Sequence, residues 1–270
     1  MIFKALADKN VWITGASSGI GLEMALLASE AGARLVLFSS RKDPLAEAAR
    51  LCLAKGAVSV HYEQVDLSDA EKAEAVALST LEAMGAPEYL ILNAGVSQRA
   101  LAGETDLAVT RKILELNFLG AVAMARPLIP AMAEKGRGRI GVTSSLTGVF
   151  GYPMRSAYAA SKHALHGYFE SVALEYASAG IKTTIAIPGF IKTAVSVNSL
   201  SGDGSRHGQM DPNQEKGMDP RKCAAKYWKA VIRGRWEKVI GGFDTIMVFL
   251  YRRLPFLFRF IGKRISPTGS

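Results

Sequence analysis

The chain has 270 residues, of which 49% are hydrophobic and 21% charged, and a net charge of +9, which suits one large α/β domain and argues against intrinsic disorder. The two cysteines, Cys52 and Cys223, lie far apart, and the four histidines show no zinc-site spacing. We therefore expect no disulfide framework, no metal site and a reducing, cytoplasmic compartment.

Strand-like apolar runs alternate with helical patterns along most of the chain. The first run, residues 11–14, is typical of a strand and not of a secretory signal, so the catalytic domain is expected to begin almost at Met1. The expected strands are Asn10–Thr14, Arg34–Phe38, Val58–Gln64, Tyr89–Leu92, Arg139–Thr143 and Thr183–Ile187. The expected helices are Gly21–Ala31, Pro44–Lys55, Asp69–Met84, two within residues 105–133, and Tyr158–Ala179.

This alternation is typical of βαβ units with right-handed crossovers. It predicts a single doubly wound, Rossmann-type α/β domain with a parallel sheet, over residues 1–242. Residues 196–218 are rich in Ser, Gly, Asp and Asn, and we expect a mobile loop that covers the substrate. Asp219 and Pro220 predict the start of a further helix, and Ser68 or Asp69 the N-cap of an earlier one.

A glycine-rich loop follows the first strand. Glycines there allow a tight turn and a close approach of the backbone to a pyrophosphate, whose charge is favoured at the N-terminus of the next helix. An ordinary glycine-rich turn is the alternative, but the order strand, loop, helix favours nucleotide binding. The cofactor-binding residues expected in this loop are Gly15, Ser17, Ser18, Gly19, Ile20 and Gly21.

The spacing Gly-x3-Gly-x-Gly in this loop resembles the TGxxxGxG pattern of the short-chain dehydrogenases/reductases. Further matches follow in that family's order over about residues 8–195: Asp66, Asn93-Ala94-Gly95, Asn117, Ser145, Tyr158-x3-Lys162, and Pro188-Gly189 with Thr193. The resemblance implies that Asp66, with Leu67, lies on the adenine side and that the Asn-Ala-Gly motif supports the cofactor cleft. It also implies that Pro188 and Gly189 approach the nicotinamide, and Thr193 its carboxamide.

The end of the second strand bears on which nicotinamide cofactor is bound. An acidic residue there accepts hydrogen bonds from the adenosine ribose, whereas an arginine accommodates the 2′-phosphate of NADP. Here Ser40, Arg41 and Lys42 follow the strand, with no acid before Asp43. Cations and hydroxyls suit a phosphate dianion, although a solvated Arg-Lys pair is the alternative. We expect NADP(H) in preference to NAD(H); Ser18, where some NADP-dependent members are basic, leaves mixed use open.

Tyr158 and Lys162 lie one helical turn apart and therefore share a face. A phenol has a pKa of about 10 and is a poor base near neutral pH. A nearby ammonium stabilises the phenolate, so we expect Lys162 to lower the pKa of Tyr158 and allow proton exchange with a carbonyl or alcohol. A Tyr-x3-Lys pair alone is weak evidence, because it is more often a surface contact. Its position thirteen residues after Ser145, the counterpart of the family's serine, makes it strong evidence for a catalytic pair.

Ser145 is expected to hydrogen-bond the substrate oxygen as charge develops on it, with Ser144 as the competing choice and backbone capping as the alternative for both. Asn117 is a polar residue in an apolar helical stretch, where a helix kink or a side-chain bond to backbone would also explain it. The resemblance implies that Asn117 holds a water that passes protons to Lys162. It also implies that NADPH delivers a hydride to a ketone carbon while Tyr158 gives the oxygen its proton, or the reverse.

Residues 144–175 resemble the branch that holds the 11β-hydroxysteroid dehydrogenases and related membrane-associated reductases. Members of that branch act on steroids, retinoids and long-chain keto lipids, so we expect a lipophilic ketone or secondary alcohol as substrate. We expect no counterpart of that branch's N-terminal membrane anchor. The family also implies a homodimer or homotetramer. The alternative functions are a catalytically silent NADP(H)-binding sensor or membrane-bound scaffold on the same fold, or a basic membrane- or RNA-binding adaptor.

The basic charge is concentrated near the C-terminus, where residues 221–264 hold 12 of the 33 Lys and Arg residues. Within the segment 243–270, the basic residues Arg252, Arg259 and Lys263 share one helical side, and Leu254, Leu257, Phe258, Ile261 and Ile265 another. No apolar run approaches the ~20 residues that span a bilayer, and Pro255 interrupts the segment. We expect an interfacial helix lying on an anionic membrane through residues 243–265, with packing on the domain or a second subunit as the alternative. Nucleic acid is not expected, because the aromatic residues cluster with aliphatic ones.

Overall fold

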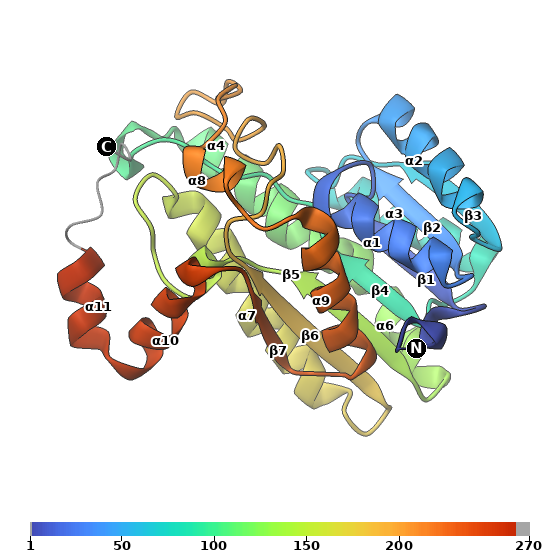
Figure 1. Cartoon of the computed structure of the whole chain (residues 1–270). Coiled ribbons are helices and arrows are strands. Elements are labelled where there is room, and N and C mark those ends of the chain that lie inside the picture. Colours follow the sequence, from blue (N-terminus) through green and yellow to red (C-terminus); the bar gives the residue numbers. More distant parts are fainter. Residues whose placement is uncertain (1, 263–270) are drawn as a thin grey trace.

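Seven parallel strands form one sheet in the computed structural model, which describes residues 2–262 (Figure 1). The strands are β1 (Asn10–Thr14), β2 (Arg34–Ser39), β3 (Ser59–Gln64), β4 (Tyr89–Leu92), β5 (Gly138–Thr143), β6 (Ile181–Pro188) and β7 (Glu237–Ile240). Their order is β3-β2-β1-β4-β5-β6-β7, so the direction of winding reverses between β1 and β4. The predicted doubly wound domain is confirmed, and the crevice beyond the carboxyl ends of β1 and β4 is where such sheets bind ligands.

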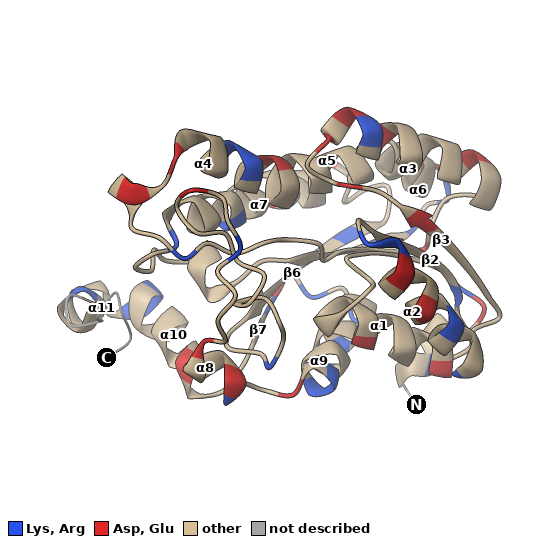
Figure 2. Ribbon diagram, turned by 90° about the horizontal axis from the view of Figure 1, so that it is seen from above, with Lys and Arg blue, Asp and Glu red and all other residues tan. Residues whose placement is uncertain are grey.

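Helices cover both faces of the sheet (Figure 2). One layer consists of α1 (Gly19–Glu30), α2 (Lys42–Ala54) and α9 (Pro220–Ile232). The other consists of α3 (Ala70–Met84), α4 (Leu107–Leu114), α5 (Gly120–Ala125), α6 (Leu128–Glu134) and α7 (Ser156–Glu175). Asp69 caps α3 by accepting a hydrogen bond from the backbone of Lys72, and Asp219 caps α9 ahead of Pro220.

The sequence-based expectations missed β7 and misplaced helix ends by a few residues. The strand β7 is short and has only Ile240 fully buried, so it carries no apolar run that marks a strand. The helix α7 begins at Ser156 and ends at Glu175, whereas Tyr158–Ala179 was expected.

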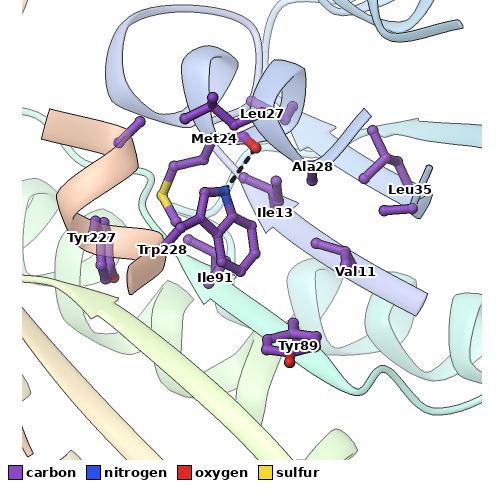
Figure 3. Packing of buried hydrophobic residues seen from close by; sticks show 14 of the residues in the cluster. Val11, Ile13, Met24, Leu27, Ala28, Leu35, Tyr89, Ile91, Tyr227 and Trp228 are labelled. Carbon is purple, nitrogen blue, oxygen red and sulfur yellow. Dashed lines mark hydrogen bonds between the residues drawn. The ribbon is translucent and has the colours of Figure 1, made fainter. Parts of the chain in front are cut away.

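The core on the α1 and α9 face is closed by two large aromatic side chains of α9, Tyr227 and Trp228 (Figure 3). The indole nitrogen of Trp228 donates a 2.9 Å hydrogen bond to the carbonyl oxygen of Met24 on α1. The same indole meets the ring of Tyr89 on β4 edge-on, with centroids 5.8 Å apart. Trp228 therefore ties α9 to both α1 and the middle of the sheet.

The helical stretch Leu107–Glu134 is long and apolar enough to cross a membrane by length and composition alone. Half of its most apolar window is buried within the domain, however. Its side chains, including Met124, Leu128 and Met132, belong to the core on the face of the sheet that α3 and α7 cover. The stretch is interrupted by a π-helical turn, Glu115–Leu119. We therefore assign it to the core of the α/β domain.

Residues 196–218, expected to be a mobile loop, carry the short helix α8 (Pro212–Glu215) and are held by isolated bridges such as Gln98 to Leu200. Ser196 and Ser199 are fully buried. The segment is thus packed onto the domain beside the carboxyl ends of the strands, and its mobility stays a prediction.

The C-terminal segment differs from the expected single helix. It forms two short helices, α10 (Ile246–Arg253) and α11 (Pro255–Gly262), because Pro255 cannot continue the hydrogen-bond ladder of α10. Arg252, expected to face lipid, instead forms a bidentate ion pair with Glu237 of β7. Phe258 packs on Phe150 of the domain, with ring centroids 5.0 Å apart. Lys263 and Ile265 lie outside the described residues.

Replacing Trp228 with alanine is expected to lower the free energy of unfolding by about 3–5 kcal/mol, because a buried indole and its hydrogen bond are both lost. The matched control is Trp236→Ala, at an exposed indole, where we expect a change of about 0.5 kcal/mol or less. Urea unfolding followed by circular dichroism measures both. Equal losses in the two variants would contradict the packing of α9 described above.

Candidate active site

The glycine-rich loop between β1 and α1 has a shape that only glycine permits at two positions. Gly15 has a φ of +65°, and a Cβ atom there would lie 2.9 Å from the Cα of Ala94. A Cβ at Gly21 would lie 2.3 Å from the carbonyl oxygen of Gly15. The loop therefore presents bare backbone, at the start of α1, to the crevice where the sheet winding reverses.

The strand ends beside this loop are tied together by Asn93. Its backbone N–H donates to the Thr14 hydroxyl at 2.9 Å, and its side-chain oxygen accepts from the Thr143 hydroxyl at 3.2 Å. The ends of β1, β4 and β5 are thus held in fixed relation. On the far side, a methyl group of Thr193 lies 3.3 Å from where a Cβ of Gly19 would be, so the segment after β6 closes on the loop.

A cavity of about 570 Å³ opens along these strand ends. Most of the predicted site residues line it: Gly15, Ser17, Ser18, Gly19, Ile20, Ser40, Asp66, Leu67, Asn93, Ala94, Gly95, Ser145, Tyr158, Lys162, Pro188, Gly189 and Thr193. The other four predicted residues are not among those that line it: Gly21, Arg41, Lys42 and Asn117. One continuous cavity therefore joins the expected cofactor loop to the expected catalytic side chains.

At the β2 end of the cavity, Arg41 lies over the glycine-rich loop. Its guanidinium donates to the hydroxyls of Ser17 and Ser18 at 3.2 and 3.0 Å. Ser17 and Ser39 are themselves joined at 2.8 Å. Lys42, the next residue, is exposed as the first residue of α2. An arginine and several hydroxyls are thus gathered where the second strand ends.

At the opposite end, the helix α7 carries Tyr158 and Lys162 side by side. The Lys162 ammonium lies 5.8 Å from the centroid of the tyrosine ring and donates a 2.8 Å hydrogen bond to the carbonyl oxygen of Thr143. Burial lowers the pKa of Lys162 to about 8. The lysine is therefore a buried group that can gain or lose a proton close to neutral pH.

The expected lowering of the Tyr158 pKa by Lys162 is not what the surroundings produce. Desolvation raises the pKa of Tyr158, opposed by a hydrogen bond with Ser145 and by the positive charge of Arg99. The Lys162 ammonium donates its hydrogen bond to the carbonyl oxygen of Thr143 and lies over the tyrosine ring, and it is not among the groups that shift this pKa. The groups that favour the phenolate here are Ser145 and Arg99.

The choice between the two adjacent serines follows from where they point. Ser144 is buried, and its hydroxyl lies 2.8 Å from the imidazole Nε2 of His166. Burial lowers the pKa of His166 to about 4, so this imidazole is neutral near pH 7. Both serines line the cavity, but Ser145 also forms a hydrogen bond with Tyr158 that favours the phenolate. Ser145 is the serine brought together with the tyrosine.

Asn117 is fully buried in the π-helical turn Glu115–Leu119. Its amide accepts from the backbone N–H of Val96 at 2.8 Å and donates to the carbonyl of the same residue at 2.9 Å and to the Ser161 hydroxyl at 2.9 Å. The side chain therefore joins the chain after β4 to α7. Its amide oxygen and the Lys162 ammonium both border Gly95.

Sequence reasoning missed two features of this end of the cavity. Arg99 and Arg155 line it, and both form ion pairs with Asp211. The turn after β6 is also bound by Asp244, whose carboxylate accepts from the backbone N–H of Phe190 at 2.7 Å. These residues belong to no spacing pattern, because they come from separate segments that meet only in the fold.

The residues present fit a nicotinamide dinucleotide. The bare loop backbone suits a pyrophosphate, and the same cavity continues past Asn93 and Gly95 to the Tyr158 hydroxyl. The cavity can therefore hold a ligand that contacts both the glycine-rich loop and Tyr158.

Comparison with known proteins identifies the family. A model of short chain dehydrogenase matches residues 9–203. Dehydrogenase/reductase SDR family member 7B of Xenopus tropicalis is 37% identical over 94% of this chain and 84% of that protein. A short-chain dehydrogenase/reductase from Burkholderia phymatum, solved with NAD, has a TM-score of 0.80, 23% identity and 97% coverage of both chains. An alcohol dehydrogenase from Thermococcus sibiricus, solved with 5-hydroxy-NADP, has a TM-score of 0.75 and 24% identity, over 87% of this chain and 97% of that one.

The family model covers most of the chain, and the relative exceeds 30% identity over nearly all of it. The chain therefore belongs to the short-chain dehydrogenase/reductase family and is an NAD(P)-dependent oxidoreductase that acts on CH–OH and C=O groups.

Proposed function

We propose that this protein is an NADPH-dependent oxidoreductase that interconverts a ketone and a secondary alcohol on a lipophilic substrate. The observation that carries the proposal is the meeting of Tyr158, Ser145 and Lys162 at one end of the cavity that begins at the glycine-rich loop. A protein that only sensed the cofactor would need no such trio.

In the proposed reaction, the Tyr158 hydroxyl gives its proton to the carbonyl oxygen, and the Ser145 hydroxyl donates a hydrogen bond to the same oxygen. The nicotinamide, when bound, supplies the hydride, and it accepts one in the reverse direction. Lys162, with a pKa of about 8, holds a proton that can replace the one lost by the tyrosine. Asn117 would position a water between Lys162 and the solvent.

The preference for NADPH rests on Arg41. Its guanidinium is exposed and bonded only to serine hydroxyls, among residues 2–262, so no carboxylate within the described chain competes with a phosphate for it. A 2′-phosphate dianion beside Ser17, Ser18 and Ser40 would gain a charge-assisted hydrogen bond. The adenine-side residues proposed with it are Asp66 and Leu67, which line the cavity.

A lipophilic substrate is supported by the walls beyond Tyr158. Leu146, Phe150 and Val195 line this end, together with Met247 and Ile261 from the C-terminal helices. Apolar walls with a few placed polar groups are typical of sites for apolar ligands.

Peripheral attachment to an anionic membrane is proposed for α10 and α11, which project from the domain beyond β7 (Figure 1). Phe249 and Phe256 are 57% and 85% exposed on them. Arg253 and Arg259 lie on the same two helices, and within residues 2–262 no carboxylate is within 4.0 Å of either. Exposed aromatic side chains interleaved with unpaired cations fit a surface of anionic lipid headgroups.

Replacing Tyr158 with phenylalanine is expected to lower kcat by about 10²- to 10⁴-fold, because the proton donor is lost. NADPH affinity, measured by cofactor fluorescence, should stay within about twofold, since only one hydroxyl is removed. Tyr168→Phe on the same helix is the matched control and should keep its activity. Substantial turnover by Tyr158→Phe would remove the tyrosine from this role. If wild type failed to oxidise NADPH with any ketone of a panel, a catalytically silent cofactor-binding protein would be favoured instead.

Replacing Arg41 with aspartate is expected to shift the ratio of kcat/KM for NADPH over NADH by about 10- to 100-fold towards NADH. The aspartate removes the phosphate partner and supplies an acceptor for the ribose hydroxyls. Arg111→Asp, at an exposed residue of α4, is the control for the change in net charge. An unchanged ratio in the Arg41 variant would contradict the phosphate site.

The variant Phe249→Glu/Phe256→Glu is expected to bind phosphatidylserine vesicles at least about tenfold more weakly than wild type, because two exposed apolar anchors become anionic. Vesicle sedimentation measures binding, and reduction of a water-soluble ketone shows that the domain is intact. Leu174→Glu, at an exposed leucine of α7, is the matched control. Equal sedimentation of the double variant and wild type would contradict the membrane assignment.

A further inference from the structure

Two arginines share a single carboxylate in the wall of the cavity beside Tyr158. Arg99 lies 2.9 Å and Arg155 lies 3.5 Å from the same oxygen of Asp211. The side chains of these three residues are only 9%, 10% and 18% exposed. They come from the chain after β4, the residue before α7, and the N-cap of α8, so the fold alone gathers them.

The cluster carries a net positive charge that the described protein does not neutralise. Asp211 is the only carboxylate among residues 2–262 within 4.0 Å of either guanidinium. Its second oxygen is already used, as it accepts from the backbone N–H of Asn213 at 2.9 Å. Both arginines also donate to the carbonyl oxygen of Gln98, at 3.1 and 2.8 Å. These neutral contacts orient the guanidinium groups without compensating their charge.

An uncompensated cation held away from water is unfavourable unless a partner of opposite charge is supplied. Desolvation lowers the pKa of Arg99, so Asp211 offsets only part of this penalty. The backbone before Arg155 is also held in an uncommon conformation, with a φ of +59° at Met154. The arrangement therefore keeps two arginines at the cavity wall despite its intrinsic costs.

The position of the cluster identifies which ligand could supply that charge. Arg99 and Arg155 line the cavity together with Tyr152 and Tyr158, and the charge of Arg99 acts on the Tyr158 hydroxyl. Arg41, the proposed partner of the cofactor phosphate, lies at the opposite end beside the glycine-rich loop. The anion that meets Arg99 and Arg155 therefore belongs to the molecule that also meets Tyr158.

We propose that Arg99 and Arg155 bind an anionic group of the substrate itself, a carboxylate or a phosphomonoester close to the reacting carbonyl, and that the substrate is an acidic keto lipid. This inference rests on the proposed function, because it places the reacting carbonyl at Tyr158. Two guanidinium groups side by side match the paired oxygens of either anion. Asp211 acts as a positioning residue that holds both arginines on the cavity wall.

The test compares ketones that differ only in charge, with NADPH as the second substrate. One pair is a long-chain keto acid and its methyl ester; the other is a long-chain keto-alkyl phosphate and the corresponding neutral keto alcohol. Wild type is expected to favour the charged member of at least one pair by about 10- to 100-fold in kcat/KM, and the pair that shows it distinguishes carboxylate from phosphate. No preference in either pair would overturn the inference.

The variants Arg99→Gln and Arg155→Gln are expected to remove most of that preference, mainly by raising KM for the charged ketone. Because both members of a pair are measured on one preparation, partial unfolding changes both rates equally and leaves their ratio untouched. Arg155→Lys keeps the charge and should keep part of the preference, and Arg126→Gln, at an exposed ion pair with Glu74 of α3 and not in the cavity lining, should keep all of it. A preference that survives in both Gln variants would overturn the inference.

Binding of the same keto acid and its ester, measured by calorimetry, gives a readout that does not depend on turnover. Tighter binding of the acid than of the ester, lost in Arg155→Gln, supports the anion site even where no ketone is reduced. Equal binding of acid and ester by wild type counts against it. Reduction of neutral ketones without any preference for anions would overturn this inference and leave the proposed function standing.

Discussion

The hydrogen bond from the Lys162 ammonium to the carbonyl oxygen of Thr143 is the contact on which the chemical end of the site depends. It fastens α7 to the carboxyl end of β5 at 2.8 Å, and the Thr143 hydroxyl in turn holds Asn93 beside the glycine-rich loop. One short chain of polar contacts thus links Lys162, on the helix that carries the proposed proton donor, to the cofactor end. Because the ammonium is buried, its bond to a carbonyl is also what keeps a charged lysine tolerable there.

Among the buried cations of the cavity, Arg99 affects the Tyr158 hydroxyl more than Lys162 does, although Lys162 is the neighbour on the same helix. Desolvation raises the pKa of Tyr158, and the positive charge of Arg99 works in the opposite direction. Negative charge that develops on a substrate oxygen, or on the phenol after proton loss, would be favoured by the same field. Arg99 therefore has two roles in our proposal: with Arg155 it would bind the anionic group of the substrate, and its charge favours anionic character at the Tyr158 hydroxyl.

Much of the fold was predictable because parallel strands buried on both faces are apolar runs, and helices between them carry their own start and stop signals. The motif residues were predictable because backbone approach and proton exchange each need particular residue types at fixed spacing. The strand β7 was not, since its side chains are mostly half-buried. The break at Leu254 had a signal in Pro255, although a single helix was expected there. The cluster of Arg99, Arg155 and Asp211 was beyond sequence reasoning, because tertiary contacts alone unite its three segments.

The C-terminal helices α10 and α11 connect the proposed membrane attachment with the proposed acidic substrate. Met247 and Ile261 line the cavity, while Phe249 and Phe256 on the same helices are exposed. Asp244, at the start of this segment, accepts a hydrogen bond from the backbone of Phe190, and both residues line the cavity, so the segment is anchored at the cavity wall. A surface that is apolar and cationic attracts acidic amphiphiles for the same physical reason that an apolar cavity ending in two arginines would bind them. A single ligand chemistry, a lipid with an acidic head, then accounts for both the exposed face and the buried charge.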